Sequence, residues 1–308
     1  MILVTTYINP DLDGFSAAIA YAEFLNKTGR LAQARFSGDY QLEVKFTAKK
    51  FGINLPVPLE NHNDFEQIVL VDVSDLKRLD KNIDLQKVVE IIDHHQVNDL
   101  AAFPNAKFLI ETIGASATLV AEKIIKSGID ISNNTVRLLC GALMYHTFNF
   151  QNFDVNQRDR NVFQWLKTKC DFPESFFREI SLAKSDLAGE KLGQAIENDL
   201  KQFEFADKKI VIAQLEIVDG DVLMRNREQE IIDKLAELKN KLKSDFIFLI
   251  IIDLEKLVDF FVCGETETRD LLEAVSGVEF KNNIAVSKKV ILRKQMALLL
   301  QKWFQDKN

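Results

Sequence analysis

Two of the four histidines stand side by side behind an aspartate, in the triplet Asp93-His94-His95. The triplet follows an apolar, β-branched run at residues 88–92, which is typical of a buried strand in a parallel sheet. Open α/β sheets hold ligands at the carboxyl ends of their strands, where this triplet would lie. Imidazole next to carboxylate suits a divalent ion such as Mn²⁺, Fe²⁺, Co²⁺ or Zn²⁺. Taken alone, the histidine pair is equally compatible with an incidental position in a loop.

Two further predicted strands also end in aspartates. Asp11 and Asp13 follow a strand at residues 2–7 and precede a helical pattern, and Asp72 ends an apolar strand at residues 67–72. Helix capping is the usual explanation for a single aspartate after a strand. Capping does not explain three successive strands that end in aspartate, one of them with two histidines attached. We therefore predict a divalent metal site formed by carboxylates at these strand ends and by one of the two histidines, while the other histidine faces a substrate.

The elements that must position these residues alternate between strand and helix up to about residue 110. Strands are predicted near 2–7, 31–36, 67–72, 88–92 and 107–110. Apolar residues at helical spacing then dominate, at 116–126, 135–147, 156–169 and 174–184. The pattern predicts an α/β fold that begins with a doubly wound parallel sheet closed by helices.

A second, smaller α/β domain with a mixed sheet is predicted behind a helix at 187–203 that spans the junction. Its predicted elements are a strand at 209–216, a long charged helix at 221–243, and strands at 246–253 and 257–263. We place the two domains at residues 1–187 and 188–308. The first domain is expected to carry the metals, and the cleft between the domains the substrate.

The order of the motifs resembles that of the DHH phosphoesterase superfamily. The four motifs are NPDLDG at 9–14, VDVSD at 71–75, IDHH at 92–95 and GASAT at 114–118. Further segments, up to Arg293-Lys294-Gln295 near the C-terminus, are similar to family II inorganic pyrophosphatases. The resemblance spans almost the whole chain and implies a DHH domain followed by a DHHA2 domain. The chain lacks the glycine-rich GGGH-type signature, which argues against an oligoribonuclease of the DHHA1 branch.

The resemblance implies a Mn²⁺-dependent hydrolase of pyrophosphate, with Co²⁺ or Mg²⁺ as alternative ions and two ions in the site. Asp72 would bridge the ions, Asp11 and Asp13 would each bind one, and His94 would be a further ligand. His95 would face the phosphate and donate a hydrogen bond or a proton to it. Lys184, together with Arg293 and Lys294, would form a cationic clamp on the phosphate oxygens, with Ser287-Lys288-Lys289 as an alternative match.

Three departures from the family pattern bear on activity. Asn9 stands where the family has the metal-binding histidine of the first motif, as in exopolyphosphatase-like members of the DHHA2 branch, and we keep it as a candidate metal ligand. His146 precedes Thr147 where the family has an acidic ligand, so it is either a nitrogen ligand or the mark of a weakened site. Leu292 stands where the clamp has an arginine. These departures leave two alternatives open, a short-chain exopolyphosphatase and a degenerate, non-catalytic homologue that binds a metal or phosphate.

Two other positions carry expectations. Ser116 and Thr118 open a predicted helix whose N-terminus can bind an anion or orient a ligand, and helix capping explains Ser116 equally well. His62 lies in a polar loop and is expected to be exposed to solvent.

The composition limits the classes of partner. A net charge of −7 disfavours bulk attraction to nucleic acid, so pyrophosphate or short polyphosphate is the expected partner. Three scattered cysteines, the absence of a signal peptide pattern and the absence of an 18-residue apolar run predict a cytoplasmic protein without membrane contact. A homodimer is compatible with these features.

Overall fold

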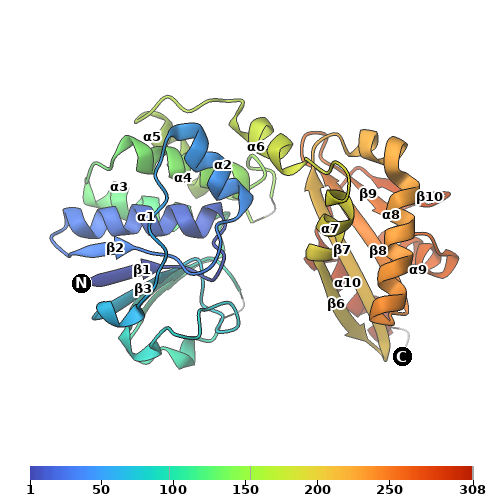
Figure 1. The fold of residues 1–308 in the computed structure, drawn as a ribbon, viewed down its shortest axis with the longest axis horizontal. Coiled ribbons are helices and arrows are strands. Elements are labelled where there is room, and N and C mark those ends of the chain that lie inside the picture. The colour runs from blue at the N-terminus through green and yellow to red at the C-terminus, as the bar shows by residue number, and fades with distance from the viewer. Residues whose placement is uncertain (97, 153, 307–308) are drawn as a thin grey trace. The chain divides into compact units, whose positions relative to one another are not determined.

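The computed structural model describes residues 1–96, 98–152 and 154–306. The chain divides into two compact units, Met1–Ile180 and Ser181–Asn308, and each has its own sheet (Figure 1). The predicted boundary between residues 187 and 188 stays a prediction. No helix in the described ranges is long and apolar enough to cross a membrane.

The first unit is built on a five-stranded sheet in which every strand pairing is parallel. The strands are β1 (Ile2–Thr5), β2 (Ala32–Ala34), β3 (Gln67–Val71), β4 (Val88–Asp93) and β5 (Lys107–Ile110). Their order across the sheet is β2-β1-β3-β4-β5, which reverses direction between β1 and β3 as in doubly wound folds. The predicted fold class is confirmed, and the reversal lies between the two strands that lead to Asp11 and Asp72.

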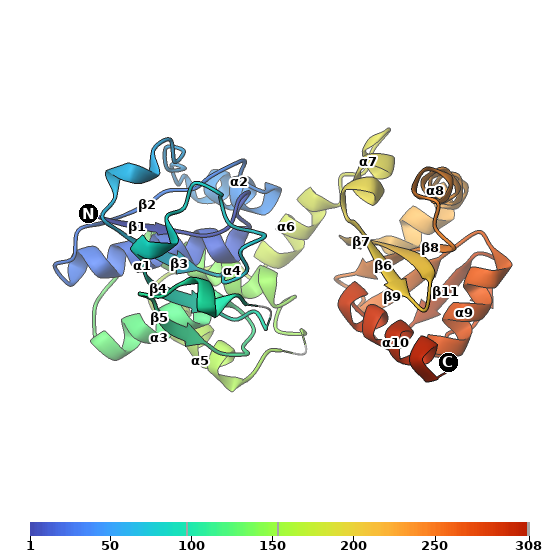
Figure 2. The same cartoon turned by 90° about the horizontal axis from the view of Figure 1, so that it is seen from below.

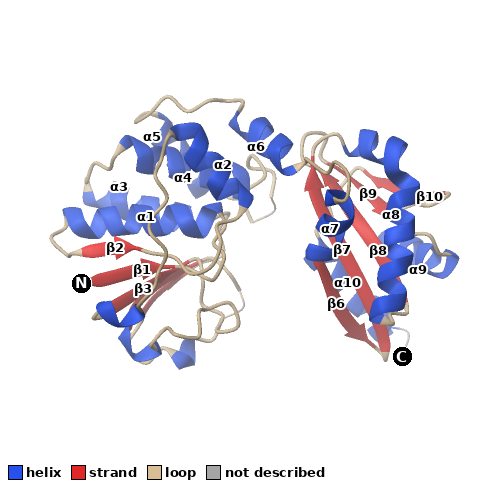
Figure 3. Ribbon diagram, viewed as in Figure 1, coloured by secondary structure: helices blue, strands red, loops and turns tan. Residues whose placement is uncertain are grey.

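Helices α1, α3 and α4 lie together over one face of this sheet (Figures 1 and 3). The helices of the first unit and its end are α1 (Leu12–Lys27), α2 (Leu42–Phe51), α3 (Ser116–Ser127), α4 (Asn133–His146), α5 (Gln157–Lys167) and α6 (Phe176–Lys184). An apolar cluster that includes Leu3, Leu70 and Phe103 packs on the same sheet. It also holds residues of the loops that follow β3 and β4. Side chains alternate between the two faces of a strand, so each strand contributes to the apolar layers on both faces of the sheet. Because the strands are parallel, their carboxyl ends lie at the same edge.

The second unit is built on a six-stranded mixed sheet with the order β10-β11-β9-β8-β7-β6. The strands are β6 (Leu200–Phe205), β7 (Lys208–Ile217), β8 (Phe246–Asp253), β9 (Val258–Val262), β10 (Phe280–Lys281) and β11 (Ile284–Ser287). Only the β7–β8 pairing is parallel among the described strands of this unit. The mixed sheet was predicted and is confirmed.

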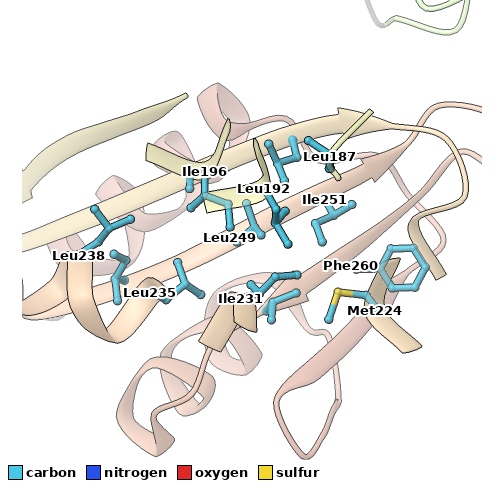
Figure 4. Close-up of a cluster of buried hydrophobic side chains, with 14 of the residues drawn as sticks. Leu187, Leu192, Ile196, Met224, Ile231, Leu235, Leu238, Leu249, Ile251 and Phe260 are labelled. Carbon is cyan, nitrogen blue, oxygen red and sulfur yellow. The ribbon is translucent and has the colours of Figure 1, made fainter. Parts of the chain in front are cut away.

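Helices cover both faces of the second sheet (Figure 2). They are α7 (Lys191–Asn198), α8 (Gly220–Leu242), α9 (Thr266–Ser276) and α10 (Arg293–Asp306). Figure 4 shows the main core, where Ile196 of α7 and Leu235 of α8 pack against Leu249 and Ile251 of β8. This unit therefore has a hydrophobic core of its own.

Two sequence expectations are wrong. The helix predicted at 187–203 ends at Asn198, and residues 200–205 form β6, which pairs antiparallel with β7. Phe203 and Phe205 lie on one side of β6 with ring centroids 6.0 Å apart, because strand periodicity brings every second residue to the same face. His62 was expected in solvent, but its side chain is only 10% exposed and its Nε2 lies 3.3 Å from Asp80 Oδ2.

Candidate metal centre

Asp11 lies directly before α1 and Asp13 in its first turn, and both are held by backbone amides. Asp11 caps α1, since its Oδ1 accepts a hydrogen bond of 2.9 Å from the Gly14 amide. Asp13 is buried, and its two oxygens accept the Ser116 and Ala117 amides at 2.7 and 2.9 Å. These two amides open α3, so the positive end of that helix fixes the Asp13 carboxylate.

Asp72 follows β3 in a left-handed backbone conformation, with φ of 63°. Its amide donates to the Ile92 carbonyl of the neighbouring strand at 2.8 Å, which holds the turn in place. The Ser116 hydroxyl donates to Asp72 Oδ1 at 2.9 Å, whereas Oδ2 is buried and has no hydrogen-bond partner among the described residues. A buried carboxylate oxygen without a donor is costly unless a cation lies against it.

His94 presents a bare nitrogen to these carboxylates. Its Nδ1 lies 2.8 Å from the Ile113 carbonyl, which can only accept, so the ring proton is on Nδ1 and Nε2 carries a lone pair. Nε2 is 3.4 Å from Asp72 Oδ1 and 3.9 Å from Asp13 Oδ2, and it has no hydrogen-bond partner in the described chain. Lone pairs that face one another in this way repel, and a divalent ion between them would remove the repulsion. The donor set therefore fits a metal.

His146, at the end of α4, joins this cluster. Its Nδ1 lies 3.6 Å from Asp11 Oδ2, and its ring centroid is 5.1 Å from that of His94. Asp13, His94 and His146 can each offer one ligand atom within 4.8 Å of the others, and the same holds for Asp72, His94 and His95. The structure thus brings together five of the predicted metal ligands; their binding of an ion stays a prediction. They are Asp11, Asp13, Asp72, His94 and His146.

The charges of the cluster explain how its pKa values shift. Burial, and then the charges of Asp13, Asp11 and Asp93, raise the pKa of Asp72 well above its usual value. Burial together with the nearby rings of His146 and His95 lowers the pKa of His94 to about 3, which keeps its imidazole neutral. Burial would raise the pKa of Asp11, but the neighbouring His146 imidazole and the hydrogen bond from the Gly14 amide outweigh it and lower that pKa. The negative charge of Asp72 is thus unfavourable without a counter-ion, and the neutral imidazole of His94 can act as a ligand, so the site is suited to a cation.

Asp93 orients the second histidine of the triplet. Its Oδ1 lies 2.8 Å from His95 Nδ1 and also accepts the backbone amides of His94 and His95, and the Ser74 hydroxyl donates to its other oxygen. The His95 ring is 35% exposed, so it faces the open side of the cluster, whereas His94 is nearly buried.

Comparisons with known proteins agree with this geometry. Residues 1–144 match the model of the DHH family N-terminal domain, and residues 178–303 match that of the DHHA2 domain. The chain belongs to the DHH–DHHA2 superfamily. It is 28% identical over 97% of its length to a probable manganese-dependent inorganic pyrophosphatase of Clostridium acetobutylicum, of which 96% is covered. It is also 28% identical to the manganese-dependent inorganic pyrophosphatase of Methanothrix thermoacetophila, with 96% of each chain covered.

Solved structures of similar fold are also known. A putative family II inorganic pyrophosphatase of Methanococcus jannaschii superposes with a TM-score of 0.71 and 25% identity, covering 99% of this chain and 100% of that one. An exopolyphosphatase-related protein of Bacteroides fragilis shares the fold, with a TM-score of 0.53 and 14% identity over 99% and 92% of the two chains.

In this DHH–DHHA2 protein, Asn9 is used in a turn beside the cluster. Its φ is 60°, and its side-chain oxygen accepts the Asp39 amide at 2.7 Å. Its carbonyl oxygen accepts the Gln41 side chain at 3.0 Å. Asn9 therefore anchors the loop after β2, and its predicted role as a metal ligand stays a prediction.

The predicted phosphate clamp belongs to the DHHA2 part of the chain. Lys184 is the last residue of α6. Arg293 begins α10, where its guanidinium pairs with the Asp199 carboxylate at 2.7 Å and its amide donates to Gln214 at 2.7 Å. Lys294 lines a pocket of about 450 Å³ in this unit together with Lys201, Phe203, Gln214 and Gln301, among others. Their contact with phosphate stays a prediction.

Sequence reasoning missed two residues beside the carboxylate and histidine cluster of this DHH–DHHA2 protein. Tyr7 is buried with its hydroxyl near Asp11, and the carbon of the Arg78 guanidinium lies 3.7 Å from the centre of the Tyr7 ring. A tyrosine four residues before Asp11 carried a weak signal, but an arginine in a polar loop carried none. Ser116 does not cap α3. Its amide donates to Asp13 and its hydroxyl to Asp72, so the start of this helix orients two predicted ligands. Thr118 donates to Asp159 at 2.5 Å.

Proposed function

We propose that this protein is a divalent-metal-dependent hydrolase of phosphoanhydrides, with Mn²⁺ as its ion and inorganic pyrophosphate as its substrate. The observation that carries the proposal is the lone pair of His94 Nε2, which faces buried carboxylate oxygens of Asp72 and Asp13 with no donor between them. The names of the full-length relatives support pyrophosphate and manganese.

The residues proposed to hold the metal come from the ends of β1, β3 and β4 and from the end of α4. They are Asp11, Asp13, Asp72, His94 and His146, with Asn9 as a further candidate. Divalent ions at such a site neutralise phosphate oxygens and make water acidic enough to attack at neutral pH. We propose that the site would hold two ions and that Asp72 would be a ligand of both. Its Oδ2 has no hydrogen-bond partner among the described residues and is therefore available to a cation.

The protein's own side chains are proposed to orient the substrate. His95 faces the open side of the cluster, and Asp93 fixes its ring through Nδ1. We propose that His95 acts on the substrate by positioning the side chain that contacts the phosphate. For the domains we keep the limits 1–187 and 188–308. Arg293 and Lys294 are proposed to contribute cations from the second of these domains, and Lys184 from the end of the first. These cations suit the several negative oxygens of a phosphoanhydride.

The proposal is tested by phosphate release from pyrophosphate, tripolyphosphate and a nucleotide panel with Mn²⁺. We expect pyrophosphate to be the best substrate and hydrolysis to stop with EDTA. Faster release from tripolyphosphate would favour the exopolyphosphatase alternative, and bound metal without release from any substrate would favour the non-catalytic homologue. Lys184→Ala should raise KM for pyrophosphate about tenfold while Mn²⁺ affinity stays unchanged; an unchanged KM would remove Lys184 from the clamp.

We further propose that the protein works in the cytoplasm, as a monomer or a homodimer, without nucleic acid. Cys140, Cys170 and Cys263 are free thiols, which suits a reducing compartment. Measuring the mass of the native protein in solution distinguishes the monomer from the dimer.

A further inference from the structure

Arg78 lies beside the metal cluster and has no assigned role. It belongs to the loop after β3, and its guanidinium carbon is 3.7 Å from the centre of the Tyr7 ring. Its Nη1 is 3.2 Å from His95 Nε2. Among the described residues no carboxylate forms an ion pair with Arg78, although four aspartates lie in the site next to it. The guanidinium thus lies beside a cluster of carboxylates but forms an ion pair with none of them.

The contact with Arg78 fixes the protonation of His95. A guanidinium carries only donors, so His95 Nε2 must accept its hydrogen bond. The ring proton is then on Nδ1, which donates to Asp93 Oδ1 at 2.8 Å. Both ring nitrogens of His95 are therefore used, and neither has an N–H left for a substrate. The donors next to this ring are the remaining N–H groups of Arg78.

Two anchors hold Arg78 in position. The Tyr7 ring beneath the guanidinium is buried and its hydroxyl lies near Asp11, so the stacking surface is next to a proposed metal ligand. The Arg78 carbonyl accepts the Ile8 amide at 3.2 Å, which ties the backbone of the loop to the segment before Asp11. Stacking on an aromatic ring leaves the edge of a guanidinium open, and that edge binds phosphate oxygens in pairs.

We propose that Arg78 binds a phosphoryl group of the substrate and is the hydrogen-bond donor that the first unit offers to it, with His95 as the residue that orients the guanidinium. The inference rests on the proposed function, since a phosphoanhydride is the anion that would sit at the metal cluster. A trianionic or tetra-anionic substrate that approaches several aspartates needs a cation besides the metal, and Arg78 supplies one from within the same unit.

The test compares Arg78→Met with Lys77→Met. Lys77 is the exposed neighbour of Arg78 on the same loop, so its replacement removes the same charge without touching Tyr7 or His95. The dissociation constant of inorganic phosphate is measured by calorimetry on the Mn²⁺-loaded full-length protein, and Mn²⁺ binding and thermal stability are measured on the same samples. Arg78→Met should weaken phosphate binding about tenfold or more and leave Mn²⁺ affinity unchanged, whereas Lys77→Met should stay within about twofold of wild type.

A second variant guards against misfolding. Arg78→Lys keeps the charge but loses the paired donors, so it should weaken phosphate binding by about threefold to tenfold. Phosphate affinity equal to wild type in either Arg78 variant, loss of Mn²⁺ affinity in both, or no phosphate binding by the loaded wild type would each overturn the inference. Phosphate binding that depends on Arg78 without turnover of any phosphoanhydride would overturn the proposed function and leave the anion site standing.

Discussion

At the residue scale, hydrogen bonds from N–H and O–H groups fix the orientation of the clustered carboxylates and imidazoles. His94 donates the hydrogen bond of its one N–H to a backbone carbonyl and points the lone pair of its other ring nitrogen toward carboxylates. Backbone amides orient Asp13, and the Ser116 hydroxyl orients Asp72. Fixing the ligands in this way before a metal arrives lowers the cost of ordering them when it binds. In the metal-free protein the clustered carboxylates repel one another, which lowers the stability of the folded state.

Asp72→Asn should therefore act in opposite directions on metal binding and on stability. Asparagine tolerates the left-handed backbone at this position, so the fold should survive. Mn²⁺ affinity should fall about 100-fold or more and hydrolysis with it. Since the pKa of Asp72 is raised, its charge opposes folding, and the metal-free variant should melt no lower than the metal-free wild type. Melting curves with EDTA and with Mn²⁺ check both signs. Asp75→Asn, on the same loop, is the control and should change neither; a wild-type Mn²⁺ response in Asp72→Asn contradicts the assignment.

Asn9→Ala separates the two roles considered for Asn9. Loss of the bond to the Asp39 amide should destabilise the protein by about 1 kcal/mol, and the left-handed backbone adds to that cost. We expect Mn²⁺ affinity to change by less than about threefold, because the side-chain oxygen is already used in the turn. A loss of Mn²⁺ affinity much larger than this, measured by titration, would instead establish Asn9 as a ligand.

At the element scale, the sequence predicted those strands whose apolar residues form a short run that ends in a polar site residue. The strands that lead to Asp11, Asp72 and Asp93 are short apolar runs, and their ends predicted a shared site because parallel strands end at one edge. β6 was missed, because its pairing with β7 is a tertiary contact that local helical spacing cannot reveal. Arg78 and the hydrogen bonds of α3 were missed for the same reason, since they join residues that are distant in the sequence.

Asp259 should make the loop before α10 sensitive to pH. It lies buried on β9, where its Oδ2 accepts the Ile291 amide at 2.5 Å and its Oδ1 has no partner in the described chain. Burial raises its pKa to about 7, against the opposing effect of that hydrogen bond. The folded state then holds a proton that the unfolded state has lost above about pH 4, so Asp259 costs stability progressively as pH rises from about 4 to 7.

Asp259→Asn should remove this dependence. The variant should gain stability relative to wild type as pH rises through this window, by of the order of 1–3 kcal/mol at pH 7.5. Urea unfolding at pH 4.5, 6 and 7.5 measures the difference, and comparing the two proteins at each pH cancels the titration of the other carboxylates. A difference that does not vary with pH would show that Asp259 is ionised throughout.

At the scale of the whole molecule, the metal cluster belongs to one of two units that have separate cores. All five clustered residues lie between Asp11 and His146, within Met1–Ile180, and the second unit has its own sheet and apolar cluster. A ligand stabilises only the state that binds it. Mn²⁺ should accordingly raise the stability of the first unit and not that of the second.

Calorimetry with and without Mn²⁺ tests this division. At 100 times its dissociation constant the ion should add about 2.7 kcal/mol to the unfolding free energy of the first unit. A fragment of residues 181–308 should unfold cooperatively at a temperature that Mn²⁺ leaves unchanged. A Mn²⁺-induced shift of the fragment would place a metal site in the second unit, and a fragment that does not fold would show that its core needs the first unit.

The position of the ligands early in the chain has a consequence during synthesis. The last of them, His146, leaves the ribosome well before residues 181–308 have been made, and at about 5–20 residues per second that remainder takes roughly 6–25 s. Most small domains fold within seconds, so the first unit has time to fold and bring its proposed ligands together while the rest of the chain is being synthesised. We expect the protein to acquire its ion while translation continues, and the ions available around the ribosome to determine which one it carries.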